Sequence, residues 1–72
     1  MTEKPTVRLV REGQYAAEVP VTLLMEDHEW APFLSAADMR KLDDVKLALR
    51  RGDLAAAGKL ARVFVMTPVA AE

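Results

Sequence analysis

The fold of this chain is decided by one stretch, residues 35–52, which reads SAADMRKLDDVKLALRRG. Ser35 can accept an amide of a first helical turn, and Asp38 can reach back to the Ser35 amide, which together make a capping box. Gly52 can take the left-handed conformation that ends many helices. Between them, apolar residues recur at steps of three and four and form one stripe: Met39, Leu42, Val45 and Leu49. The sequence predicts a helix here that packs across a sheet.

Length and composition bound what the rest can be. The chain has 72 residues, 51% of them hydrophobic and 29% charged, with a formal net charge of -1. These values indicate one small globular domain over residues 1–72, near the size at which burial only narrowly exceeds conformational entropy. The pattern of elements described below makes it an α+β domain, with residues 1–5 and 69–72 frayed. Domains of this size often gain stability by pairing. No run of about 20 apolar residues could span a bilayer, and the lack of cysteine suits a reducing cytoplasm.

Before the helix, the pattern predicts two strands, residues 6–11 and 15–26, joined at Gly13. In the second strand apolar and other residues alternate with a period of two. A three-residue loop, residues 12–14, would put Val7 and Leu9 on the face that carries Val19, so we expect that loop, with a two-residue Gly13-Gln14 turn as the second choice. Pro20 cannot donate to a ladder and favours an edge position for its strand.

After the second strand, we expect a loop over residues 27–32, with Trp30 and Phe33 covering one end of the core. A short second helix should start after Asp53 and run over residues 54–59, followed by a strand over residues 61–67. The predicted fold is therefore β-β-α-α-β. The right-handed crossover rule gives a three-stranded sheet in the order 2-1-3, with the last strand parallel to the second and both helices on one face.

The other face of this predicted sheet would be open and apolar. It would carry Val10, Thr22 and Leu24, together with either Phe64 and Met66 or Val63 and Val65. Contiguous exposed apolar area usually marks an interface, whereas a different strand register would make the same residues core. We expect a non-enzymatic interaction module that forms a homodimer through this face or the edge of strand 61–67. The predicted interface residues are Val10, Thr22, Leu24, Phe64 and Met66.

The candidates for chemistry are weaker. His28 is the only histidine and has acidic neighbours on both sides, but adjacent residues of an extended loop point in opposite directions and seldom hold one ion. Asp43 and Asp44 suit a solvated helix face, and Ser35 suits a cap better than a nucleophile. No catalytic residue, cofactor or metal is therefore predicted, and a cleft around Asp27, His28 and Trp30 is the third choice.

Several phrases carry a resemblance: YAAEVPV at residues 15–21, WAP at 30–32, KLD at 41–43, ALRRGDL at 48–54, and RVF and TPV at 62–64 and 67–69. The chain resembles a family of short bacterial proteins of about this length that has no assigned function. The resemblance covers nearly the whole chain and implies no activity or cofactor. Such proteins sometimes occur among mobile genes and toxin–antitoxin pairs.

That context sets the alternative prediction, an antitoxin-like or regulatory protein that binds a protein partner or nucleic acid. Its binding surface would be the basic residues Arg50, Arg51, Lys59 and Arg62. Acidic residues are interleaved with this set, which is typical of an ordinary solvated surface. Salt-sensitive binding would be expected if the set contacts nucleic acid.

Overall fold

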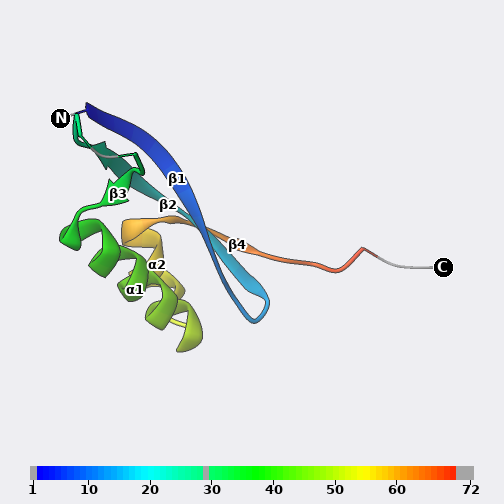
Figure 1. The fold of residues 1–72 in the computed structure, drawn as a ribbon. Helices are drawn as coiled ribbons and strands as arrows, with labels where there is room; N and C mark the ends of the chain where they lie inside the picture. Colours follow the sequence, from blue (N-terminus) through cyan, green and yellow to red (C-terminus); the bar gives the residue numbers. More distant parts are fainter. Residues whose placement is uncertain (1, 29, 70–72) are drawn as a thin grey trace.

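The computed structural model describes residues 2–28 and 30–69, and it has the predicted α+β class (Figure 1). Two long strands, β1 (Thr2–Glu12) and β2 (Tyr15–Met25), are followed by a two-residue strand, β3 (Phe33–Leu34). Helices α1 (Ala36–Arg50) and α2 (Leu54–Leu60) come next, and β4 (Arg62–Val65) closes the order. Residues 2–5, expected to be frayed, belong to β1. Met1 and residues 70–72 of the expected frayed ends lie outside the described residues.

The β1–β2 hairpin has the two-residue turn, not the three-residue loop that we expected. Glu12 pairs with Tyr15, and of the two turn residues between them only Gly13 has a positive φ, of 60°. A positive φ at the first turn position is typical of a type II′ turn, which matches the twist of the strands it joins. The register therefore pairs Val10 with Ala17 and Leu9 with Glu18. One residue fewer in the turn moves every β1 side chain to the opposite face from the one expected.

The strand order differs from the expected 2-1-3. β2 lies in the centre, with β1 along one side and both β3 and β4 along the other, and every pairing is antiparallel. The expectation treated both helices as one long crossover. Instead the chain turns sharply between α1 and α2 at Gly52, whose φ is 74°. As a result, β4 pairs with β2 in the antiparallel direction, along the side of β2 that β1 does not occupy.

Pro20 lies in this central strand because of a gap in the sheet. On the side away from β1, β4 pairs with residues 15–18 of β2 and β3 pairs with Leu23 and Leu24, so no strand covers the backbone between them. Proline has no N–H group to donate, but at this position an N–H group would have had no neighbouring strand to bond. Two side chains of α1 bond the backbone at this gap: Lys41 donates to the Pro20 carbonyl at 2.7 Å, and Asp38 accepts from the Thr22 amide at 2.9 Å.

Helix α1 begins where the sequence predicts. The Ser35 hydroxyl accepts the Asp38 amide at 3.1 Å, which confirms the N-cap. The Asp38 carboxylate does not complete the capping box in the expected way, because it bonds to Thr22 of the neighbouring strand. Asp53 caps α2 in the same manner, accepting from the Ala56 amide.

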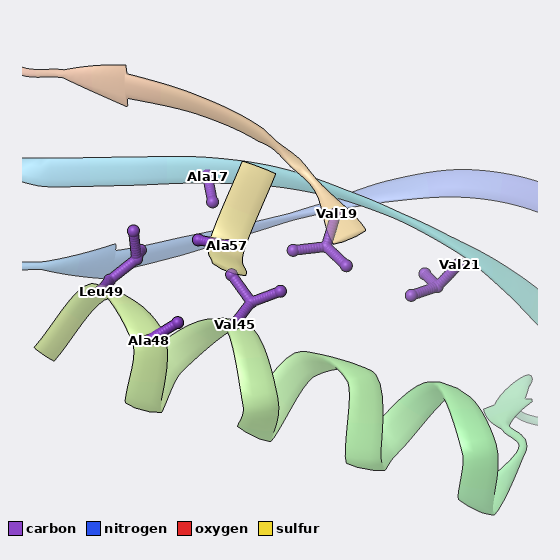
Figure 2. Packing of buried hydrophobic residues seen from close by; sticks show 7 residues of the cluster. All are labelled: Ala17, Val19, Val21, Val45, Ala48, Leu49 and Ala57. Carbon is purple, nitrogen blue, oxygen red and sulfur yellow. The ribbon is translucent and has the colours of Figure 1, made fainter. Parts of the chain in front are cut away.

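Both helices pack on one face of the sheet, as predicted (Figure 1). Figure 2 shows Val45, Ala48 and Leu49 of α1 directed at the sheet, with Ala57 of α2 beside them. Their partners on β2 are Ala17, Val19 and Val21. Of the predicted stripe, Leu42 is half-buried and packs against this core, whereas Met39 is 52% exposed.

The loop before β3 does not cover the core as expected. Trp30 is 99% exposed, and Phe33 is exposed rather than buried. Phe33 pairs with Leu24 as part of β3, and this pairing fixes its side chain to the sheet face away from the helices. A phenylalanine in a sheet is more often buried, so the exposure of Phe33 shows that this part of the sheet face is uncovered.

Candidate interaction surface

The face of the sheet opposite the helices is uncovered among the described residues. Directly paired residues of neighbouring strands project to the same face, so the register assigns its members. We call this surface the open face. It consists of Glu3, Pro5, Val7, Leu9, Arg11, Ala16, Glu18, Pro20, Thr22, Leu24, Phe33, Arg62 and Phe64.

The open face is largely apolar and exposed. Leu9 is 62% exposed and Val7 is 54% exposed, although both lie within a regular strand. Phe33 and Phe64 are also exposed, at opposite ends of the face. Ala16 is buried although it lies outside the core cluster, because Phe64 pairs directly across from it. Large apolar side chains in one contiguous patch usually mark an interaction site.

The predicted interface residues fall on both sides of the sheet. Thr22, Leu24 and Phe64 lie on the open face, as expected from their positions in the strands. Val10 lies on the helix-covered face and packs against the core, because the shorter turn reverses β1. Met66 follows β4, half-buried, and its amide bonds to the Gln14 carbonyl beside the hairpin turn at 2.6 Å.

Sequence reasoning missed the most exposed members of this surface, Val7 and Leu9. It assigned them to the core because three residues were counted in the turn. The available signal was the Gly13-Gln14 pair itself, since glycine at the first of two turn positions is typical of a hairpin. With that turn, Val7 and Leu9 pair with Pro20 and Glu18, so they lie on the sheet face opposite to the one that carries Val19.

A shallow hollow interrupts the open face beside Pro20. It has a volume of about 470 Å³ and lies next to the gap between β3 and β4, where the end of α2 reaches the sheet. Its floor and walls are mostly apolar. The lining residues are Val7, Glu18, Pro20, Gly58, Leu60, Ala61 and Arg62.

The two charged residues of the hollow carry opposite charges and lie next to each other. Glu18 of β2 and Arg62 of β4 are direct partners in the register, so their side chains leave the same face side by side. The Arg62 guanidinium carbon also lies 5.2 Å from the centre of the Phe64 ring, within the range of a cation–π contact. Opposite charges of equal size leave this part of the open face with no net charge.

The four basic residues of the alternative surface lie on different elements. Arg62 belongs to the open face, whereas Lys59 is in α2 and Arg50 ends α1. The Arg50 Nε donates to a Glu12 carboxylate oxygen at 2.9 Å, and this hydrogen bond lowers the pKa of Glu12 below its ordinary value of 4.5. Arg51 lies 3.9 Å from the Asp53 carboxylate. Two of the four cations therefore already face a carboxylate of the same chain.

The residues considered for catalysis or metal binding lie on separate elements. His28 is exposed in the turn after β2, and Asp43 and Asp44 are exposed on α1. Within residues 2–28 and 30–69, no group of three or more histidine, cysteine, aspartate or glutamate side chains could hold a metal ion. None of the helices in that part of the chain is long and apolar enough to cross a membrane.

No protein-family model matches this chain, and the comparisons with curated proteins and with solved structures give no match either. The resemblance to short bacterial proteins stays a prediction from the sequence.

Proposed function

We propose that this chain is a non-enzymatic interaction module that works as a homodimer, joined through the open face of its sheet. The observation that carries the proposal is the exposure of Val7 and Leu9 in the middle of a regular strand. Two further features support it: the size of the core and the total exposed surface.

The core is small for a chain of this length. In the described residues, eight hydrophobic side chains are buried, and four of them are alanines. The largest fully buried side chains are Leu49, Val19 and Val45. A domain of about 70 residues is already marginal when its burial is ordinary. A second copy over the open face would add apolar burial that one copy lacks.

The exposed surface is larger than that of a compact monomer. The accessible area is 5511 Å², whereas a compact chain of 8.0 kDa exposes roughly 4,500 Å². The difference, roughly 1,000 Å² per chain, is close to the ~800 Å² that each partner buries in a standard interface. The extended residues 66–69 contribute part of this excess (Figure 1).

A charge on the open face tests the proposal. Leu9 is mostly exposed in one copy, so Leu9→Glu should leave the fold intact and prevent association. Leu47→Glu is the matched control, since Leu47 is also a large exposed side chain but lies on α1. Light scattering at several chain concentrations, with and without high salt, should give a dimer for the original chain and for Leu47→Glu, and a monomer for Leu9→Glu. A monomeric original chain, or a dimeric Leu9→Glu variant, would contradict the proposal.

The same measurement separates the alternative function. Association through Arg50, Arg51, Lys59 and Arg62 would weaken as salt rises, because screening acts on exposed charges. An apolar interface should be indifferent to salt or strengthened by it. We further propose the cytoplasm as the site of action, since a chain without cysteine suits a reducing compartment.

A further inference from the structure

The open face carries an exposed apolar side chain and a recess side by side. Leu9 is the most exposed large apolar residue of that face, and the hollow begins at Val7, two residues along the same strand. The hollow continues across Pro20 to Leu60 at the end of α2. One copy therefore presents both halves of a complementary contact.

We infer that, in the homodimer proposed above, Leu9 of each copy inserts into the hollow of the other copy, against Pro20 and Leu60. A two-fold axis requires that if residue i contacts residue j, then residue j contacts residue i in the partner. Because each copy carries both Leu9 and the hollow on the same face, the contact between Leu9 and the hollow forms twice, once in each direction. The contact closes after two copies, so it forms a dimer rather than a fibre.

Charge and area agree with a second copy as the occupant. Glu18 and Arg62 at the hollow are direct sheet partners of opposite charge, so covering them buries no net charge. An unpaired buried charge would instead be costly. Each chain also exposes roughly 1,000 Å² more than a compact monomer, of which residues 66–69 contribute part, whereas one partner contributes ~800 Å² to a standard interface. A small ligand would leave most of that area, including Phe33 and Phe64, exposed.

Filling the hollow from within one chain tests the inference. A Cβ built at Gly58 meets no atom within 4 Å, and Gly58 lies in helix α2 without a positive φ. Gly58→Leu should therefore keep the fold, favour the helix and occupy the space that Leu9 of the partner copy needs. The dimer should dissociate at a higher chain concentration than the original. Ala55→Leu is the control, because Ala55 is exposed on the same helix but does not line the hollow.

Cysteine pairs give the second test, since the chain has no native cysteine. Leu9→Cys and Leu60→Cys chains, refolded together and oxidised, should form a disulfide-linked heterodimer of doubled mass on a non-reducing gel. A disulfide needs Cα atoms within about 7 Å, so cross-linking reports direct apposition. Leu9→Cys mixed with Leu47→Cys should stay unlinked.

The outcomes distinguish this inference from the proposed function. If the original chain is a dimer but Leu9→Cys links only to itself, or Gly58→Leu dimerises normally, the insertion of Leu9 is overturned and the homodimer stands. If the original chain is a monomer at every concentration, both are overturned. Heterodimer formation together with weaker dimerisation of Gly58→Leu supports the inference.

Discussion

The backbone amide of Thr22 donates a hydrogen bond to the Asp38 carboxylate, 2.9 Å away and 16 residues along the chain. The bond lies at the gap between β3 and β4, where β2 has no neighbouring strand on the side away from β1. A helix side chain thus completes the hydrogen bonding of the central strand. Lys41 does the same for the Pro20 carbonyl, one turn further along α1.

Removing this acceptor should destabilise the fold. Asp38→Ala leaves the half-buried Thr22 amide without its partner, and we expect a loss of about 1–3 kcal/mol in the free energy of unfolding. Asp38→Asn keeps an oxygen that can accept, so its loss should be smaller. Asp44→Ala changes an exposed carboxylate of the same helix and should cost under about 0.5 kcal/mol. Urea unfolding at one fixed chain concentration measures all three, and equal losses for Asp38→Ala and Asp44→Ala would contradict this role.

The Glu12–Arg50 pair predicts a dependence of stability on acid. The hydrogen bond from Arg50 lowers the pKa of Glu12 below 4.5 in the folded state. A carboxylate with a lowered folded pKa stabilises the fold fully above its unfolded value and loses that contribution as the pH falls through the folded value. Arg50→Gln should therefore reduce stability at neutral pH and flatten the decline below pH 4.5.

Chemical unfolding of both chains at neutral and at acidic pH provides the measurement. Arg51→Gln is the control, because the Arg51 guanidinium lies 3.9 Å from Asp53 and makes no contact with Glu12. The free energies of unfolding of the two variants should differ at neutral pH and become similar at acidic pH. Parallel pH profiles for the original chain and Arg50→Gln would rule out this linkage.

The hairpin turn should depend on Gly13. Its φ of 60° is disfavoured for residues with a Cβ, even though a Cβ there would meet no atom within 4 Å. We expect Gly13→Ala to cost about 1–2 kcal/mol, because the cost comes from backbone conformation and not from a clash. Gln14→Ala should be nearly neutral, since Gln14 has no positive φ and bonds Met66 through its backbone. Thermal or urea unfolding that ranks these two variants in the reverse order would argue against the observed turn.

Trp30 and Leu49 should differ sharply in their effect on stability. Trp30 is fully exposed, so Trp30→Ala should change the free energy of unfolding by less than about 0.5 kcal/mol. Leu49 is one of the largest fully buried side chains, and Leu49→Ala should cost about 2–5 kcal/mol. Urea titration followed by circular dichroism measures both without relying on the tryptophan signal. A large effect of Trp30→Ala would mean that this ring is covered in solution, for example by a partner copy.

Much of the fold could be predicted from the sequence because it depends on local signals. Ser35 and Asp53 start the two helices as predicted, since a cap needs only a side-chain oxygen and an amide three residues later. The period of two in residues 15–25 correctly separated Ala17, Val19 and Val21 from the opposite face. Thr22 and Leu24 lie on the open face for the same reason, whereas for residues 63–66 the pattern left two faces open and the pairing of Phe64 with Ala16 decided between them.

The alternation of apolar residues could not choose between turns of two and three residues, and only the Gly13-Gln14 pair favoured the shorter turn; that choice decided where β1 faces. A period of two is preserved under a shift of one residue, so the pattern of β1 fits either face equally well. The structure puts Val10 against the core and exposes Val7 and Leu9. The surface that carries the proposed function therefore depends on a single residue in a loop.

The strand order was decided by tertiary contacts alone. Pro20 favours an edge when only the backbone of its own strand is considered, because proline cannot donate to a ladder. In the structure it lies in the central strand, beside a gap where Asp38 and Lys41 bond the neighbouring backbone groups. The sequence by itself determined strands β1, β2 and β4, both helices with their caps and the buried stripe of β2, since these follow from residues close together in the chain, but it did not predict β3. Strand order, and with it the full extent of the open face, was decided only when distant segments met, because it depends on pairings between residues far apart in sequence, such as Glu18 with Arg62.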